Sequence, residues 1–152
     1  MYHYKKPTIK EIPAMQNLVL AEVENGNILV RSEDEMATTI RSYIVVYDNE
    51  QLIGFVALHI HSPILCEIRS LVVSQQYRGK GVGSQLIRLA IDEAKEYDLK
   101  QILVLTYQQQ LFEKFDFAVI DKSSIPDNKI WADCIKCKHF PICDEIALML
   151  NV

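Results

Sequence analysis

The chain has 152 residues, of which 49% are hydrophobic and 24% are charged, as is ordinary for a soluble globular protein. A chain of this length buries roughly 68–70% of its unfolded surface, so we expect one domain over residues 1–152 with a core of its own. The net charge of −4 argues against non-specific nucleic-acid binding, which needs a basic face.

No signal for membrane insertion or export is present in the sequence. It has no apolar run of about 18 residues, the length that a membrane span needs. The beginning, MYHYKKPTIKEIP, lacks the apolar centre of a signal peptide. We therefore expect a cytoplasmic protein with no membrane partner, in which the four cysteines are reduced.

The first part of the chain predicts two helices. Apolar residues at helical spacing over 13–26 predict a helix with Gly26 as its C-cap. Ser32 stands three residues before Glu35, which is the pattern of a capping box, and predicts a short helix over 32–42.

The remainder of the chain predicts strands with two helices between them. Residues 43–62 form two β-rich runs around a polar turn at 48–51, which predicts a hairpin. The further predicted elements are a strand at 66–73, an amphipathic helix at Val82–Tyr97, a strand at 101–106, a short helix at 108–115, and strands at 116–121 and 145–150. This order of elements predicts an α/β domain with a mixed sheet.

The run Arg78-Gly79-Lys80-Gly81-Val82-Gly83 places three of the five glycines between a predicted strand and a predicted helix. Glycine lets a backbone approach a ligand closely, and the N–H groups at a helix N-terminus favour an anion such as phosphate. Arg78 and Lys80 add positive charge. The spacing fits neither a Walker loop nor GxGxxG. From the residues alone, an anion-binding loop and a plain glycine-rich turn both remain open.

These residues also match the [RQ]xxGx[GA] signature, through which the chain resembles the GNAT family of acetyltransferases. The resemblance implies a mixed, mostly antiparallel twisted sheet flanked by helices, with a central strand pair that splays apart. It also implies acetyl-CoA as co-substrate, with its pantetheine arm along one strand and its pyrophosphate on the glycine loop. The implied cofactor-binding residues are Leu71, Val72, Val73, Arg78, Gly79, Lys80, Gly81, Val82, Gly83 and Ser84.

A narrower resemblance runs from about residue 9 to residue 150. The segments NILVRS, ALHI, EIRSLVV, LTYQQQLFEKFDF and WADCIKCKHFPICDEIAL are similar to the short amino-acid N-acetyltransferases of the N-acetylglutamate synthase type. This implies an enzyme that acetylates the α-amino group of an amino acid, first of all L-glutamate, in arginine biosynthesis. The alternatives are another small amine or a protein N-terminus as acceptor, or a non-catalytic acyl-CoA-binding module. The resemblance is also compatible with a homodimer.

Acetyl transfer to an amine needs a base for the ammonium proton and no covalent enzyme intermediate. Glu67 is the candidate base, because a carboxylate inside a strand is unusual and members of the family often carry a base glutamate on this strand. Strand alternation predicts Glu67, Arg69, Leu71 and Val73 on one face. The alternative is a structural pair of Glu67 with Arg69 at an exposed strand end.

Arg31 and Arg69 are the candidate substrate-binding residues, because a guanidinium group can bind a carboxylate with two hydrogen bonds and glutamate has two carboxylates. The alternative for Arg31 is a solvated residue beside a helix cap. His59 and His61 share a face, and either could act as a base at neutral pH. A polar outward face also explains both histidines, and we favour that interpretation.

The chain departs from the family at one functional position. The resemblance implies a tyrosine, in a pattern like LYxKxGF, that protonates the leaving CoA thiolate. That position is Phe112 here, and the glycine of the pattern is Asp116. Phenylalanine has no proton to donate, so we name Tyr107 as the candidate substitute and second catalytic residue.

The pattern C-x2-C-x-H-x3-C near the end of the chain could supply four zinc ligands, Cys134, Cys137, His139 and Cys143. The alternatives are reduced cysteines that only pack, which we favour, and a CxxC redox pair. We therefore predict no metal site.

Overall fold

The computed structural model describes residues 2–24, 31–125 and 145–152. The strands are β1 (Tyr2–Lys5), β2 (Tyr43–Asp48), β3 (Gln51–Ile60), β4 (Leu65–Val73), β5 (Gln101–Thr106), β6 (Ala118–Val119) and β7 (Ile146–Asn151). The helices are α1 (Ile12–Glu24), α2 (Glu33–Thr38), α3 (Val82–Glu96) and α4 (Gln109–Glu113). Ser32 caps α2 as predicted, and its Oγ accepts a hydrogen bond of 3.1 Å from the Glu35 N–H. The predicted cap Gly26 lies outside the described residues.

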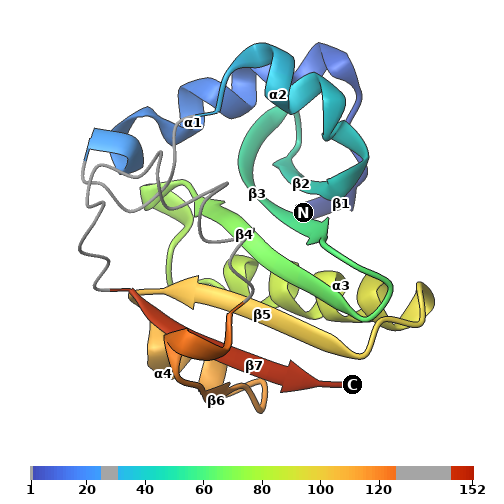
Figure 1. The fold of residues 1–152 in the computed structure, drawn as a ribbon. Helices are drawn as coiled ribbons and strands as arrows, with labels where there is room; N and C mark the ends of the chain where they lie inside the picture. The colour runs from blue at the N-terminus through green and yellow to red at the C-terminus, as the bar shows by residue number, and fades with distance from the viewer. Residues whose placement is uncertain (1, 25–30, 126–144) are drawn as a thin grey trace.

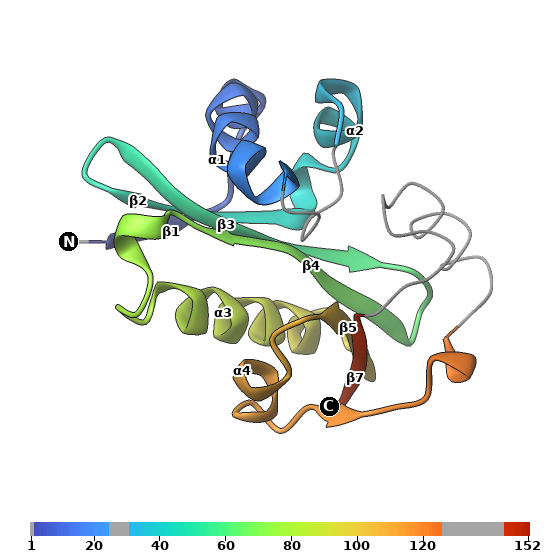
Figure 2. The same ribbon diagram turned by 90° about the vertical axis from the view of Figure 1, so that its left-hand side faces the viewer.

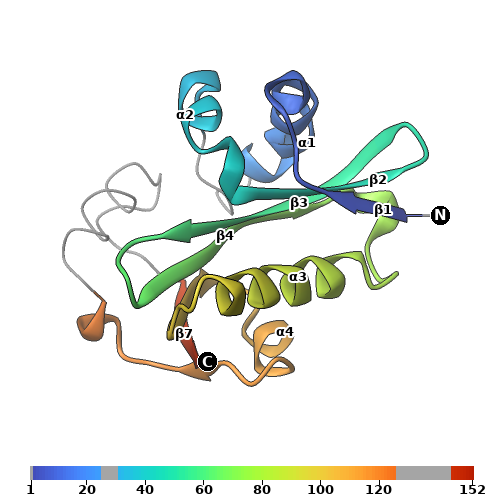
Figure 3. The same cartoon turned by 90° about the vertical axis from the view of Figure 1, so that its right-hand side faces the viewer.

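The strands form one seven-stranded sheet in the order β1-β2-β3-β4-β5-β7-β6. Every neighbouring pair is antiparallel except β4 with β5. Helices α1 and α2 cover one face of this sheet, and α3 and α4 cover the other (Figures 2 and 3). The structure therefore confirms the predicted mixed, mostly antiparallel sheet flanked by helices.

Each face of the sheet has its own apolar core. The larger core holds the apolar stripe of α3 together with Phe112 and Phe117, and the smaller core packs α1 and α2 on β2 and β3. The stripe of α3 confirms the predicted amphipathic helix, with one correction. Tyr97 lies just past the helix end and is 60% exposed, so it does not belong to the stripe.

In the described part of the chain, no helix combines the length and the apolar character needed to cross a membrane.

The parallel strands β4 and β5 pair over a short stretch and then separate. Their register covers only Leu65–Glu67 opposite Gln101–Leu103, although β4 continues to Val73 and β5 to Thr106. The two ribbons lie together at their beginnings and diverge towards their C-terminal ends (Figure 1). This is the splayed central pair that the family resemblance implies.

A β-bulge interrupts β4 just beyond this short stretch of pairing. Ala57 of β3 pairs with Arg69, but Phe55 pairs with Val72, so β4 contains one more residue than its partner. At the bulge, Ser70 has a φ of 57°, which lies in the left-handed region that residues other than glycine rarely adopt.

The bulge reverses which face each side chain of β4 occupies. Ile68 packs in the core with α3, so its neighbours Glu67 and Arg69 face α1 and α2. After the extra residue, Leu71 and Val73 pack against the α3 core instead. The predicted common face of Glu67, Arg69, Leu71 and Val73 is therefore wrong, because strict alternation does not hold through a bulge.

Substitution of Ser70 tests the bulge through the free energy of unfolding. We expect Ser70→Val to lower it by about 1–2 kcal/mol, because a β-branched residue is strained at positive φ. Ser70→Gly should keep or raise stability, since glycine adopts this conformation without strain. Ser74→Val, at a φ of −54°, is the matched control. Urea unfolding that finds Ser70→Val no less stable than Ser74→Val would contradict the bulge.

Candidate active site

A charged, hydrogen-bonded network occupies the face of β3 and β4 that points towards α1 and α2. The Glu67 Oε1 atom accepts a hydrogen bond of 2.9 Å from His61 Nε2 and lies 4.0 Å from Arg69 Nη1. Arg69 Nη2 in turn donates a 3.1 Å hydrogen bond to His59 Nδ1, and the two histidine rings meet edge to face at 4.7 Å. The four side chains thus form one continuous chain of contacts.

Glu67 is a buried carboxylate, with only 3% of the residue exposed. A buried charge is retained in a folded protein where partners compensate for its lost hydration. His61 is one such partner, at 2.9 Å, and the Arg69 guanidinium lies 4.0 Å away. The alternative of a pair at an exposed strand end therefore does not describe this site.

The structure corrects the interpretation of the two histidines as a solvated outward face. The His61 side chain is 13% exposed and bonded to Glu67, and His59 is half-buried and bonded to Arg69. Only the pairing of the two strands reveals this placement. The predicted hairpin and the short turn after it bring the end of β3 beside the start of β4, which places His59 opposite Glu67.

The two predicted substrate arginines lie on this face together. The Arg31 side chain is 12% exposed, and its Nη1 atom is 3.6 Å from Glu35 Oε2, so the alternative of a solvated residue is wrong. Both arginines act on the buried Tyr43. Burial raises the pKa of the Tyr43 hydroxyl, and the positive charges of Arg31 and Arg69 partly oppose this rise. The charges of two guanidinium groups from distant parts of the chain therefore both act on one phenol.

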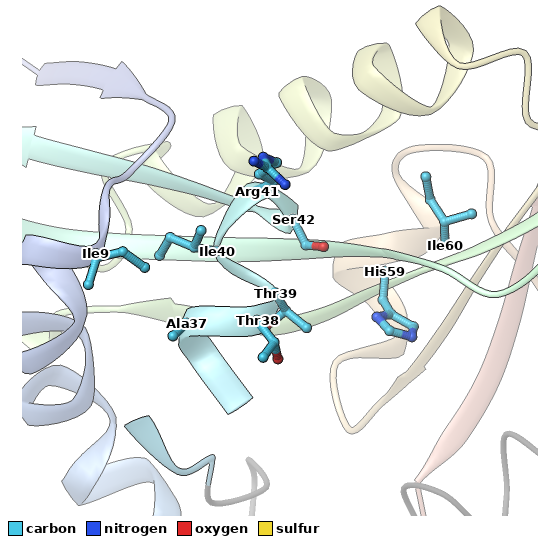
Figure 4. Close-up of a pocket in the computed structure, with 9 residues that line it drawn as sticks. All are labelled: Ile9, Ala37, Thr38, Thr39, Ile40, Arg41, Ser42, His59 and Ile60. Carbon is cyan, nitrogen blue, oxygen red and sulfur yellow. The ribbon is translucent and has the colours of Figure 1, made fainter. Parts of the chain in front are cut away.

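A hollow of about 450 Å³ borders the network at His59. Its walls come from the end of α2, the turn that follows it and the end of β3, and they include Thr38, Thr39 and Ser42 beside His59 (Figure 4). This volume falls in the range of small-molecule sites. No motif in the sequence marks these three hydroxyl residues as part of a site.

The glycine loop has the backbone conformation that its residues predict. Gly79 and Gly81 have φ values of 78° and 84°, and Gly81 is the N-cap of α3. A Cβ added at either glycine would meet no atom within 4 Å, so conformation rather than space requires glycine there. The first N–H groups of α3 have no partners within the helix, and they point towards this loop.

Tyr77, which sequence analysis missed, holds the glycine loop to the β2–β3 hairpin. Its hydroxyl donates a 2.7 Å hydrogen bond to Asp48 Oδ2, and this bond is the main cause of its raised pKa. Its ring meets Tyr2 edge to face at 6.0 Å and lies under the Lys80 ammonium at 5.6 Å. On the strand side, Arg78 Nε donates to the Val73 carbonyl at 3.3 Å.

The predicted acid and the family's tyrosine position lie in different surroundings. Phe112 is 2% exposed and packs its ring on Phe117 at 5.5 Å, so this position belongs to the core here. Tyr107 is 40% exposed and follows β5 directly, at the end where β4 and β5 have separated. Its role as an acid stays a prediction.

The cysteines divide into two groups. Cys134, Cys137, Cys143 and the accompanying His139 lie outside the described residues. Cys66 is buried on the α3 side of β4, where burial, followed by the charge of Glu67, raises the pKa of its thiol to about 12. This thiol is not a nucleophile at neutral pH. Among the residues with a described placement, no group of three or more acidic, histidine or cysteine side chains is arranged to hold a metal ion.

Comparison with known proteins identifies the family. Residues 13–117 match the model of the acetyltransferase (GNAT) family, and the chain belongs to that family. An uncharacterized N-acetyltransferase of Chlorobaculum tepidum is 31% identical over 141 residues, which are 93% of this chain and 90% of that protein. The amino-acid acetyltransferase of Pasteurella multocida is 23% identical over 124 residues, which are 80% of this chain but only 28% of that protein.

The fold of the chain is similar to that of a solved structure. N-acetylglutamate synthase from Neisseria gonorrhoeae, complexed with coenzyme A and N-acetyl-glutamate, matches with a TM-score of 0.89 at 20% identity. The match covers 99% of this chain and 35% of that one, and at this identity it shows the fold. The chain is therefore an N-acetyltransferase with the GNAT fold, and its co-substrate is acetyl-CoA.

A substitution in the glycine loop tests where the cofactor phosphates bind. We expect Gly81→Asp to weaken CoA binding by about tenfold or more, because it adds negative charge at a phosphate site. Gly81→Asn is the matched control, since asparagine has a similar size and tolerance for positive φ but no charge. Equal CoA affinities of the two variants in isothermal titration calorimetry would remove the loop from the phosphate site.

Proposed function

We propose that this enzyme transfers the acetyl group of acetyl-CoA to the α-amino group of an amino acid, with L-glutamate as the leading acceptor. The observation that carries the proposal is the convergence of Arg31, Arg69 and the Glu67–His61 pair on one face of the sheet. The first two supply sites for carboxylates, and the pair supplies a base for an ammonium group. We also propose a place in arginine biosynthesis and in the cytoplasm.

The arginines suit an acceptor that carries carboxylates. A guanidinium group binds a carboxylate through two parallel hydrogen bonds, and burial strengthens such a pair. Arg31 and Arg69 are both largely shielded from water, with 12% and 16% of their side chains exposed. Glutamate has two carboxylates for these two groups, and a hollow lies beside His59, the hydrogen-bond partner of Arg69.

The separation of β4 and β5 suits the acyl donor. Beyond Glu67, the described residues of β4 pair with β3 on one edge but not with β5 on the other. The backbone groups of Leu71–Val73 can therefore bind the amides of the pantetheine arm, as an added strand would. The pyrophosphate then reaches the amides of residues 78–84, one loop further along the chain. The thioester lies in the gap between the two strands.

The reaction follows from this placement. The ammonium group of the acceptor gives a proton to the Glu67–His61 pair, and the free amine attacks the thioester carbonyl. The nitrogen–carbon bond forms, the carbon–sulfur bond breaks, and CoA leaves as a thiolate. Tyr107, at the end of β5, is the proposed proton donor to this thiolate, and the second proton lost by the acceptor nitrogen replaces the one that Tyr107 gives, so that this proton in effect ends on sulfur. No covalent enzyme intermediate is needed.

A panel of acceptors tests the substrate. We expect acetyl-CoA consumption, measured as free thiol, to be fastest with L-glutamate among the twenty amino acids and several polyamines. A rate only with other amines would contradict the glutamate assignment and leave the family and cofactor intact. Binding of CoA without a rate for any amine would favour the non-catalytic module.

Charge reversal at Arg31 tests the carboxylate site. We expect Arg31→Glu to lower kcat/KM for glutamate about a hundredfold or more, because it removes charged hydrogen bonds and adds repulsion. An uncharged amine accepted by the wild type should be acetylated at a similar rate by the variant. Arg88→Glu, exposed on α3, is the matched control. Unchanged glutamate kinetics in Arg31→Glu would remove Arg31 from the site.

A further inference from the structure

The hydrogen bond between Glu67 and His61 gives the two side chains different chemical tasks. We propose that His61 takes the proton from the acceptor ammonium on its Nδ1 atom, and that Glu67 is the positioning residue that holds the imidazole. This inference rests on the proposed function, whose mechanism assigns the proton only to the pair. It identifies the atom that accepts the proton.

The geometry determines which nitrogen of His61 carries hydrogen. A charged carboxylate only accepts hydrogen bonds, so the 2.9 Å contact with Glu67 Oε1 requires a hydrogen on Nε2. In the neutral imidazole, Nδ1 then has the lone pair. When Nδ1 takes a proton, the positive ring remains bonded to a negative partner, as in the histidine–carboxylate pairs of hydrolases.

Glu67 itself is poorly placed to receive the proton. The oxygen that accepts from His61 also lies 4.0 Å from the Arg69 guanidinium, and the Glu67 side chain is only 4% exposed. Protonation of this carboxylate would weaken its interactions with both neighbours. His61 has the more accessible side chain, at 13%. It lies directly after β3, and its backbone N–H is fixed by a 2.9 Å bond to the Leu65 carbonyl.

The groups around His61 favour a proton on its ring at the moment of reaction. Glu67 and Arg69 face it from β4, and His59 faces it from β3 with a ring contact of 4.7 Å. Glu67 stabilises the imidazolium directly. The Arg69 guanidinium lies 4.0 Å from the same Glu67 oxygen, and its bond to His59 fixes that ring with an unprotonated Nδ1. An imidazole, unlike a carboxylate, exchanges protons near neutral pH.

The step balances with groups already named. One ammonium proton moves to Nδ1 of His61, and the nitrogen lone pair forms the bond to the acetyl carbon. The carbon–sulfur bond breaks with its electrons on sulfur, and the second nitrogen proton ends on that sulfur. His61 then returns its proton to solvent. The net products are the N-acetylated acceptor, free CoA and one proton.

Chemical rescue distinguishes His61 from Glu67 as the base. The acceptor is the best substrate of the wild type, whichever amine that is, so failure of the glutamate assignment does not affect this test. We expect His61→Ala to lower kcat by about 10²–10⁴-fold and added imidazole to restore at least a tenfold rate. His59→Ala removes the same ring from the same face, and we expect no rescue there.

The pH profile gives the second readout. In Glu67→Gln, the acidic limb of kcat should persist, because the imidazole that accepts the proton is still present. In His61→Gln, which retains an amide donor towards Glu67, this limb should disappear. CoA affinity in all variants reports whether the fold is intact. The proposal would be overturned by two results together. The acidic limb of kcat would be lost in Glu67→Gln, and His61→Ala would keep that limb and show no rescue by imidazole. Glu67 would then be the base.

Discussion

The extra residue at Ser70 is the constraint on which the geometry of this enzyme depends. Before the bulge, β4 directs Glu67 and Arg69 towards α1 and α2, and after it the strand directs Leu71 and Val73 towards α3. The bulge occurs where β4 has lost its pairing with β5. In the proposed function, one strand therefore serves two partners: its side chains before the bulge meet the acceptor, and its backbone after the bulge binds the acyl donor.

The two ends of the site follow different physical rules. At the glycine loop, the proposed binding of phosphate depends on backbone N–H groups, positive φ angles and a helix N-terminus, with Tyr77 and Asp48 holding the loop to the sheet. At the proposed acceptor end, the chemistry depends on buried charged side chains. Burial removes most of the hydration of these charges, so the side chains must stabilise one another. This division explains why the sequence alone predicts the loop but not the arrangement of the acceptor end.

Local signals predicted the elements that local physics determines. The glycine spacing, the stripe of α3 and the cap at Ser32 each depend on neighbours within a few residues, and the structure reproduces them. The sequence EIRSLVV contains no glycine or proline to announce a bulge, so the reversal after Ser70 could not be foreseen. The burial of Phe112 was likewise hidden, since its environment comes from Phe117 and α3.

The acceptor end needed tertiary information that residue types alone do not hold. Arg31 and Arg69 were named for their chemistry, but only the fold brings both of them near Tyr43. The histidines were assigned to solvent because they share a polar face opposite Leu58 and Ile60, whereas the hairpin register places His59 opposite Glu67. Register is a property of two strands together, and a one-residue error in it exchanges the buried and exposed faces.

The most direct test of this account is a crystal structure of the chain with CoA and N-acetyl-L-glutamate. The account predicts the pyrophosphate on the amides of residues 78–84 and the pantetheine along Leu71–Val73 in the gap between β4 and β5. It also predicts the product's carboxylates on Arg31 and Arg69, with its amide nitrogen beside His61. CoA bound away from that gap, or a product whose carboxylates contact neither arginine, would contradict it.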